Sequence, residues 1–270
     1  MTDTPDSAPQ PDSTSGGVGR SIELEIEVPG TPEEVWRAIA TGPGVSSWYV
    51  RHRIEEREGG DVEFDFGPDM QATGRVAAWD PPRRVLIDGG DVEGLAFEWI
   101  VEARDGASCV VRLVNSGFGS GEEWDAQYDA MRDGWLIFLS NLRLHLTHFG
   151  GRSATPSLPM ANWAGPRTMA WQRLLADLGL PEQPNAGDRI VVTADDAPPL
   201  AGMVADVAHD HLALVLDQPA EGTAFLAAEQ VGDTVSVSVW SYLYGDEADA
   251  LVERDEAQWR AWLAARSTDG

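Results

Sequence analysis

The chain has 270 residues, of which 45 are acidic and 19 basic, and its formal net charge is −26. So negative a molecule repels phosphate backbones and anionic lipid head groups, which argues against nucleic acid and membrane surfaces as partners. Every basic residue is arginine, and without lysine the chain cannot form a Schiff base, attach pyridoxal phosphate or supply the phosphate-binding lysine of a P-loop.

Cys109 is the only cysteine, so the sequence excludes an internal disulfide and a CxxC metal site. Because it alternates with Val111 and Leu113, we expect it to be a small buried hydrophobe. No basic, apolar leader opens the sequence, and no run of about 18 apolar residues occurs. We therefore expect a cytoplasmic protein that is neither secreted nor membrane-spanning, with no cofactor and no metal.

Residues 1–19 consist mainly of Pro, Ser, Thr, Asp and Gly, a composition that predicts a disordered tail. Residues 21–28 alternate apolar and glutamate side chains, which predicts a strand with one solvated face. Thr31-Pro32-Glu33-Glu34 then combines a capping threonine, a first-turn proline and a reciprocal glutamate. A helix should start there, followed by a short helical piece that carries Trp48.

A series of alternating segments separated by turn residues follows. The turn Asp105-Gly106 is typical of a two-residue hairpin. The expected strands contain residues 62–66, 72–78, 85–87, 95–101 and 109–113. Consecutive hairpins of this kind predict an antiparallel sheet.

Residues 121–149 carry apolar side chains at alternating steps of four and three, the period of one helix face. A helix of this length is about 40 Å long at ~1.5 Å per residue, enough to cross a small domain. Something broad and apolar must cover it, and the preceding strands provide it. We therefore expect an α+β domain in which a curved sheet surrounds a long C-terminal helix.

The order and spacing of several short motifs resemble the START-related helix-grip (SRPBCC) superfamily, and within it the branch named after the activator of Hsp90 ATPase. The resemblance covers roughly residues 21–149, and the motifs that carry it are Val28-Pro29-Gly30-Thr31-Pro32-Glu33-Glu34-Val35-Trp36, Trp48, Gly59-Gly60-Asp61, Gly74-Arg75-Val76, Trp79-Asp80-Pro81-Pro82-Arg83, Asn115-Ser116-Gly117-Phe118 and Asp133-Gly134-Trp135. It implies a helix-grip fold with a cavity between sheet and helix that holds apolar or amphipathic small molecules.

Large aromatic residues on the expected helix and strands would line such a cavity. Trp48 is expected near its mouth. The candidate ligand-binding residues are Trp48, Phe64, Phe97, Trp99, Tyr128, Met131 and Trp135. The alternative is that these residues simply fill the core, although facing Trp and Tyr rings need partners for their polar atoms and often leave room between them.

Three functions are compatible with this reading. The leading one is binding of a small apolar or amphipathic molecule without catalysis. An enzyme of polyketide aromatase/cyclase type would need a polar pair inside the cavity. A protein-interaction module, including a chaperone co-factor, is suggested by the family name alone.

Residues 150–165 are rich in Gly, Ser and Pro and predict a linker between the first domain, residues 20–149, and a second domain, residues 166–270. The second domain is expected to contain a helix, several strands and a closing helix, which is the order of the first. Gly187-Asp188 echoes Gly60-Asp61, and Gly202-Met203-Val204 echoes Gly74-Arg75-Val76. We interpret the second domain as a smaller, reduced α+β copy that has lost its opening strand and one further strand.

A sheet without its edge strand leaves backbone groups unpaired, so the second domain should lean on the first domain or on a second chain. Trp240, Tyr242 and Tyr244 form an aromatic run on the face opposite the valines Val235, Val237 and Val239. Such a run indicates a buried interface. A homodimer through the second domain is one way to bury it.

Overall fold

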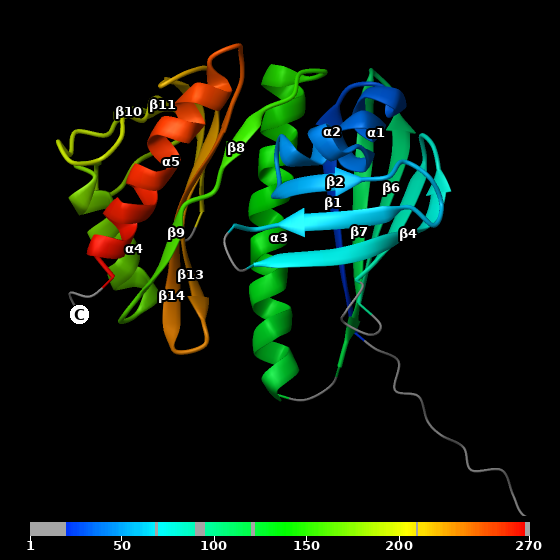
Figure 1. Ribbon diagram of the computed structural model, residues 1–270, viewed down its shortest axis with the longest axis horizontal. Helices are drawn as coiled ribbons and strands as arrows, with labels where there is room; N and C mark the ends of the chain where they lie inside the picture. The colour runs from blue at the N-terminus through cyan, green and yellow to red at the C-terminus, as the bar shows by residue number, and fades with distance from the viewer. Residues whose placement is uncertain (1–19, 68–69, 90–94, 120–121, 209, 268–270) are drawn as a thin grey trace, which may run out of the picture.

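The computed structural model describes residues 20–67, 70–89, 95–119, 122–208 and 210–267. The tail expected at residues 1–19 lies outside them. Two antiparallel sheets stand on either side of one long helix, α3 (Glu122–Phe149), which runs the height of the molecule (Figure 1). The first half of the chain has the helix-grip architecture that the sequence predicts.

Sheet A contains the first seven strands in the order β1-β7-β6-β5-β4-β3-β2, with every neighbouring pair antiparallel. Its first and last strands in sequence order, β1 and β7, therefore lie side by side. The elements before α3 are β1 (Arg20–Pro29), α1 (Pro32–Ala40), α2 (Gly42–Ser46), β2 (Arg51–Ile54), β3 (Asp61–Asp65), β4 (Gln71–Asp80), β5 (Arg84–Asp88), β6 (Ala96–Arg104) and β7 (Ser108–Phe118).

The predicted start of α1 is confirmed at the level of individual hydrogen bonds. The backbone N–H of Glu34 donates to the Thr31 hydroxyl at 3.3 Å, and the Thr31 N–H donates to the Glu34 carboxylate at 2.8 Å. This reciprocal pair satisfies two N–H groups that a helix end would otherwise leave open. Cys109 is fully buried on β7, as its alternation with valine and leucine predicts.

The strand β2 was not predicted, because its sequence Arg-His-Arg-Ile is too short and too polar to show an alternation. Its strand partner among the described residues is β3, so β2 lies at the edge of sheet A. Position at the edge explains the composition, since charged side chains on edge strands hinder pairing with other chains.

Sheet B contains the strands of the second half in the order β10-β11-β12-β13-β14-β8, and β9 also pairs with β14. The elements after α3 are β8 (Thr155–Ser157), β9 (Met160–Trp163), α4 (Arg167–Asp177), β10 (Arg189–Val191), β11 (Ala201–Ala208), β12 (His211–Gln218), β13 (Gly222–Val231), β14 (Thr234–Leu243) and α5 (Ala248–Ala265). A second α+β unit thus follows the first.

The interpretation of residues 150–165 as a linker is wrong for its second half. β8 and β9 both pair antiparallel with β14, and Trp163 is buried. Together they form an edge strand interrupted at Leu158 and Pro159. Proline is tolerated in edge strands. The Pro- and Ser-rich composition of this segment is therefore compatible with a strand as well as with a linker.

This edge strand also corrects the view that the second unit lacks an opening strand. β8 and β9 lie beside the last strand, β14, just as β1 lies beside β7 in sheet A. The remaining strands, β10 to β14, form a meander like that of β3 to β7. Only a counterpart of β2 is missing among the described residues, so the second unit is reduced by one strand, not two.

Local hydrogen bonds repeat between the two units at positions 128 residues apart. In the first unit the N–H of Gly59 donates to the Val76 carbonyl and the Val76 N–H to the Gly60 carbonyl. In the second unit the N–H of Gly187 donates to the Val204 carbonyl and the Val204 N–H to the Asp188 carbonyl. The register shifts after Val76 in β4 and after Val204 in β11. A β-bulge at the same place in both units supports the internal repeat.

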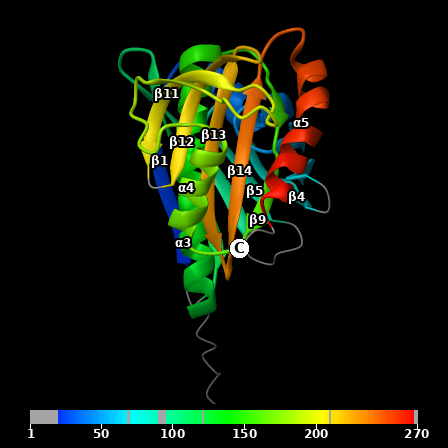
Figure 2. The same ribbon diagram turned by 90° about the vertical axis from the view of Figure 1, so that its left-hand side faces the viewer.

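The layers of the molecule follow from which face of each sheet the helices cover. α4 and α5 cover one face of sheet B, as Figure 2 shows, and α3 lies against the other. α3 also packs on β1 of sheet A, so one helix serves both sheets. The order of layers is α4 and α5, sheet B, α3, sheet A.

The predicted aromatic interface is formed inside the chain. Trp240 and Tyr242 join the core of the first unit, where Trp240 lies against Phe138 of α3 with ring centroids 5.6 Å apart. Tyr244 stacks on Phe149 at 4.0 Å. Because α3 already covers this face of sheet B, the aromatic run gives no reason to expect a second copy of the chain there.

Candidate functional site

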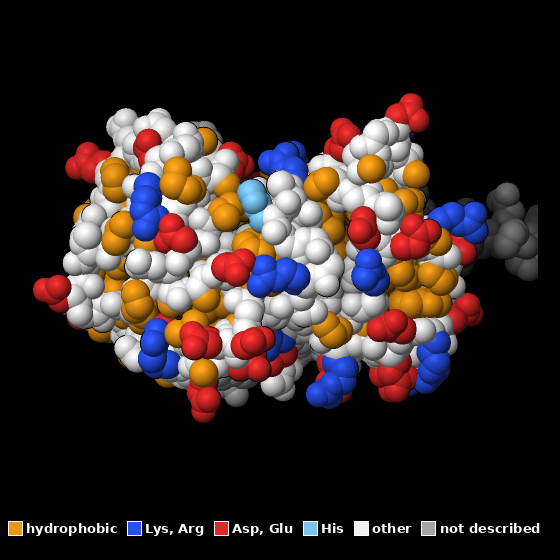
Figure 3. All heavy atoms as spheres, turned by 90° about the horizontal axis from the view of Figure 1, so that it is seen from above, with side chains coloured by type: hydrophobic (Ala, Val, Ile, Leu, Met, Phe, Trp, Pro, Cys, Tyr) orange, Lys and Arg blue, Asp and Glu red, His pale blue; other side chains and the backbone are white. Residues whose placement is uncertain are grey.

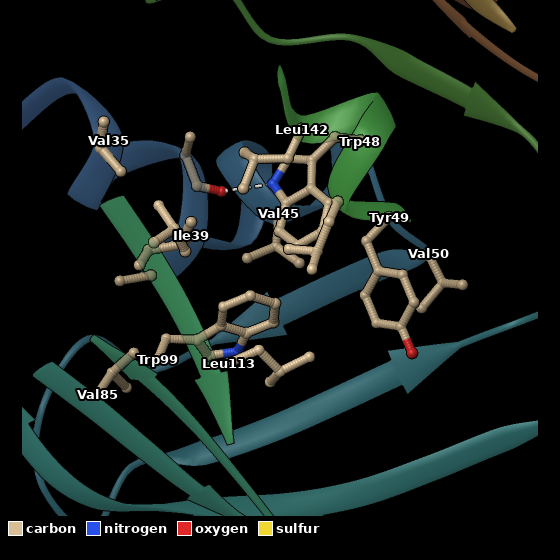
Figure 4. Packing of buried hydrophobic residues seen from close by; sticks show 14 of the residues in the cluster. Val35, Ile39, Val45, Trp48, Tyr49, Val50, Val85, Trp99, Leu113 and Leu142 are labelled. Carbon is tan, nitrogen blue, oxygen red and sulfur yellow. Dashed lines mark hydrogen bonds between the residues drawn. The ribbon is translucent and has the colours of Figure 1, made fainter. Parts of the chain in front are cut away.

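The aromatic residues predicted to line a cavity meet between α3, the segment after α2, and sheet A. The rings of Trp48 and Trp99 lie edge to face at 5.6 Å, and Trp99 meets Trp135 of α3 at 5.5 Å. Phe97 and Phe64 continue the cluster. Figure 4 shows Trp48 and Trp99 facing one another across the interior, with Tyr49 beside them.

The indole N–H groups of Trp48 and Trp135 are already bonded within the protein. The Trp48 indole N–H donates to the Ala38 carbonyl at 2.8 Å (Figure 4), and the Trp135 indole N–H donates to the Asn115 side-chain oxygen at 3.2 Å. The prediction that Trp48 lies near a mouth is wrong, because Trp48 is completely buried. Trp48 and Trp135 therefore offer a ligand no free indole donor.

The space left inside this cluster is small. An enclosed void of about 20 Å³ remains between Trp48, Phe64, Phe97, Trp99 and Trp135. A void of this size holds roughly one water molecule, whereas ligand pockets measure roughly 300–1,000 Å³. In this conformation the rings fill the core. This is the alternative to a ligand cavity that the sequence also allows.

Tyr128 and Met131, the other two predicted residues, do not reach the inner cluster. The Tyr128 hydroxyl donates to the Ser21 carbonyl, and its ring packs on Phe118 under the Arg20 guanidinium. Tyr128 lies about two helical turns before Trp135 and contacts the end of sheet A instead. Met131 packs at the edge of this core but does not line the void inside it; it lines a space toward the second unit.

Beyond α3, between the two units, lies an open cleft of about 750 Å³ that we call the apolar cleft. Its floor is one face of α3, including Met131, Trp135 and Phe138. One wall comes from the first unit and the other from β9 and β14. The apolar side chains that line it are Tyr49, Phe66, Met70, Ala130, Met131, Trp135, Phe138, Met160, Val231 and Trp240. Its volume and lining are those of a small-molecule site.

One residue that lines the apolar cleft has an unused hydrogen-bond donor. The indole N–H of Trp240 is buried and has no partner among the described residues. A buried donor without a partner carries a desolvation cost of about 1–3 kcal/mol. An acceptor atom on a molecule bound in the cleft would remove that cost.

Four charged residues also line the apolar cleft: Asp129 and Asp133 on α3, Arg167 on α4 and Glu229 on β13. Burial raises the pKa of Glu229 above its ordinary value; Arg167 opposes the rise and Asp133 adds to it. A Cβ atom at Gly134 would lie 3.7 Å from a carboxylate oxygen of Glu229, so that oxygen lies over the bare backbone of α3. The lining of the cleft thus combines many apolar side chains with four charged ones.

A second open cleft, of about 730 Å³, lies between β1, α3 and sheet B. We call it the acidic cleft, because five carboxylates and two guanidinium groups line it: Glu25, Asp133, Asp206, Asp210, Glu229, Arg143 and Arg167. Figure 3 shows that acidic and arginine side chains are otherwise interspersed over the upper face of both units. Asp133, Arg167 and Glu229 line both clefts.

Sequence reasoning missed most of the apolar cleft because it is formed by both units. Tyr49 and Phe66 follow elements of the first unit, and Trp240 belongs to the second. The available signal was the aromatic run at Trp240, which the sequence linked to an interface but not to a ligand. The described part of the chain contains no group of three or more His, Cys, Asp or Glu side chains arranged to hold a metal ion.

The chain is similar to known proteins mainly over its first unit. The model of the family "Activator of Hsp90 ATPase homolog 1-like protein" matches residues 29–147. Two uncharacterized proteins of Mycobacterium tuberculosis, MT1597 and Rv1546, are 26% identical over 87 residues. The match covers 28% of this chain and 61% of each relative, so the chain spans about three fifths of their length.

Solved structures are similar at low identity. DynU16, a protein of the dynemicin biosynthetic locus, matches with 17% identity and a TM-score of 0.42, over 92% of this chain and 96% of its own. CalU16 from Micromonospora echinospora matches with 20% identity and a TM-score of 0.39, over 48% of this chain and 78% of its own. The Aha1 dimer from Colwellia psychrerythraea matches with 19% identity and a TM-score of 0.41, over 47% and 96%. Similarity at this level says nothing about ligand or activity.

No described helix has both the length and the apolar character needed to cross a membrane.

Proposed function

We propose that this protein binds a small amphipathic molecule without catalysis, as expected for a START-related helix-grip domain; the match of residues 29–147 to the model of the Activator of Hsp90 ATPase homolog 1-like family supports this. The site we propose is the apolar cleft between the two units, not the void between sheet A and α3. The observation that carries the proposal is the unpartnered indole N–H of Trp240 in a cleft of about 750 Å³.

The chemistry of the lining describes the ligand. Aromatic and methionine side chains on α3 and on both walls favour an apolar, flat or flexible body. The Trp240 N–H favours an acceptor such as a carbonyl or ether oxygen within that body. Ser236 and Ser238 line the same wall and add hydroxyl groups. The ligand we propose is therefore an aromatic or alicyclic molecule that bears oxygen acceptors.

Binding of naphthalene and of 2-acetylnaphthalene, compared by displacement of a fluorescent dye, tests this proposal. Both should bind, because both fit an apolar cleft. Trp240→Phe should lower the affinity for 2-acetylnaphthalene by about fivefold, which corresponds to the loss of roughly one hydrogen bond. The affinity for naphthalene should change by less than about twofold. Trp36→Phe is the matched control, since Trp36 is equally buried but lies outside the cleft.

A second variant closes the cleft without weakening the helix. A Cβ at Gly134 meets only ordinary contacts, and any larger side chain there occupies the cleft floor. Gly134→Leu should abolish binding of both compounds while α3 gains helix propensity, and Gly134→Ala should reduce binding less. Unchanged binding in Gly134→Leu would place the ligand elsewhere and overturn the proposal.

An enzyme of aromatase/cyclase type is the second candidate, favoured by one observation. Glu229 lines the apolar cleft with a raised pKa and Asp133 and Arg167 nearby, which suits a general acid or base. The complex with 2-acetylnaphthalene distinguishes an enzyme from a binding protein. An enzyme would accelerate deuterium exchange of the methyl protons of the bound compound. Glu229→Gln would remove this acceleration but retain binding. A binding protein would accelerate nothing.

A further inference from the structure

We propose that the acidic cleft is a second binding site, specific for a small organic cation with two ammonium groups, and that Asp206, His211 and Glu229 hold it. Glu229 also lines the apolar cleft, whereas Asp206 and His211 line the acidic cleft alone, so changes at Asp206 test this inference separately.

The three residues come from three neighbouring strands of sheet B. His211 on β12 lies opposite Ala208 of β11 and opposite Ala227 of β13. Asp206 and Glu229 are each two residues from those partners, and side chains two apart share a face of a strand. The three side chains therefore lie on one face of the sheet. Asp206 is level with Ala213, two residues beyond His211, whereas Glu229 lies two residues to the other side of His211. Each acidic residue is at the diagonal spacing of roughly 7–8 Å from His211, and the two carboxylates lie on opposite sides of the ring.

His211 shows that this face has an unused polar group. Its side chain is buried, with 5% of the residue exposed, and its Nε2 has no hydrogen-bond partner among the described residues. Burial lowers the pKa of His211 to about 4; the charge of Asp206 raises this pKa and the charge of Arg167 lowers it. The ring is therefore neutral at pH 7. A neutral imidazole with its proton on Nδ1 accepts a hydrogen bond at Nε2.

The charges around the cleft leave room for a cation. Arg167 lies 3.1 Å from Asp210 and 4.0 Å from Asp133, and Glu25 is paired with Arg112 at 2.7 Å.

Arg143, the other guanidinium group of the lining, is exposed and lies ten residues along α3 from Asp133, about 15 Å away. Asp206 and Glu229 have no salt bridge within 4.0 Å in the described part of the chain. A diamine can place one ammonium group at each carboxylate, and the imidazole nitrogen between them accepts a further N–H hydrogen bond.

Anions and neutral molecules suit the cleft less well. An anion would meet more carboxylates than guanidinium groups in a partly enclosed space, where charges are screened less than on an open surface. A neutral alcohol would gain hydrogen bonds but no charge attraction. The lining therefore distinguishes a diamine from a diol of the same length and shape.

Titration of the full-length protein with 1,4-diaminobutane, followed by calorimetry and by the ring nitrogen shifts of His211 in NMR spectra, tests the proposal. The diamine should bind and shift the His211 signals, while 1,4-butanediol should do neither at the same concentration. Asp206→Asn and Glu229→Gln preserve shape and should each weaken the diamine by about tenfold, as expected for loss of a charge-assisted hydrogen bond.

Glu23→Gln is the matched control, because Glu23 is exposed on β1, beside the cleft but outside its lining, and the change removes the same charge. It should alter binding less than twofold. Equal losses in Glu23→Gln and Asp206→Asn would show attraction to the acidic surface in general and would overturn the site. Absence of a His211 shift on diamine binding, or equal binding of the diol, would do the same.

Discussion

The strands β7 and β14 occupy the same position in their two units but have different surroundings. β7 alternates buried and half-buried residues along its length, whereas β14 is buried on both faces from Val235 to Leu243. The outer face of sheet A carries charged pairs such as Arg112 with Glu25. The corresponding face of sheet B carries Trp240 and Tyr242. The same strand order thus supports either a solvated or a buried outer face.

The difference originates in α3. In the first unit the closing helix packs on its own sheet and then meets the back of sheet B. In the second unit the closing helix, α5, packs mainly on β8, β9 and β14 of sheet B, and it reaches the first unit through an ion pair of Glu256 with Arg51. A sheet covered on both faces needs apolar residues on both, which is why β14 lacks the polar alternation of β7. The second unit should therefore depend on the first for its folding.

The largest expected effect comes from separating the units. Residues 155–270 retain β8 and β9 but would expose Phe225, Trp240 and Tyr242, which the intact chain buries. We expect this fragment to self-associate or precipitate, because such a contiguous aromatic face is unstable in water. Size-exclusion chromatography with light scattering, together with thermal unfolding, measures this. A monomeric fragment that unfolds cooperatively would show that the second unit is self-sufficient.

A smaller effect is expected from one ring that bridges the units. Phe138 on α3 contacts Tyr49 of the first unit at 4.5 Å and Trp240 of the second at 5.6 Å, measured between ring centroids. Phe138→Ala should lower the free energy of unfolding by about 3 kcal/mol, the lower end for a phenylalanine because the side chain is half-buried.

Leu136→Ala on the same helix is the control for this change. Leu136 is 45% exposed, so its truncation should cost no more than about 0.5 kcal/mol in urea unfolding. Similar losses in both variants would mean that Phe138 does not hold the units together. Two separate unfolding transitions in Phe138→Ala, with one in the wild type, would support the bridging role most directly.

Local signals made most of the fold predictable. The helix α3 was predicted from its 3–4 spacing, and α1 from its capping residues, because both patterns are complete within a few turns. β8 and β9 were not predicted, since Pro156 and Pro159 suggest turns and the pairing that makes them strands is with β14, about 80 residues later. A pattern that depends on a distant partner is absent from the local sequence.

The site was less predictable than the fold for a related reason. Trp48, Phe64, Phe97, Trp99 and Trp135 do meet as expected, yet the sequence does not contain the spacing of their rings, which decides between a cavity and a filled core. The apolar cleft requires the placement of one unit against the other. Trp135 and Met131 were identified because they lie on the apolar face of the predicted helix. No local pattern in the sequence indicates that Phe66 and Met160 line the same cleft.

Two glycines allow the equivalence of the units to be tested with a matched pair of substitutions. A Cβ at Gly74 of β4 would lie 2.4 Å from the Asp88 carbonyl oxygen, and one at Gly202 of β11 would lie 2.3 Å from the Val215 carbonyl oxygen. Each obstacle is backbone of the neighbouring strand and cannot rotate away. We expect Gly74→Ala and Gly202→Ala each to lower the free energy of unfolding by about 2 kcal/mol, as overpacking does.

Gly134→Ala is the control for this pair, because its Cβ would meet only ordinary contacts and alanine favours a helix interior by about 0.5–1 kcal/mol over glycine. If the units are equivalent, the losses at Gly74 and Gly202 should agree within about 0.5 kcal/mol, since both strands carry the same bulge two residues further on. A loss at Gly74 with none at Gly202 would mean that sheet B adjusts where sheet A does not. The two units would then share the order of their strands but not the tight packing at this glycine.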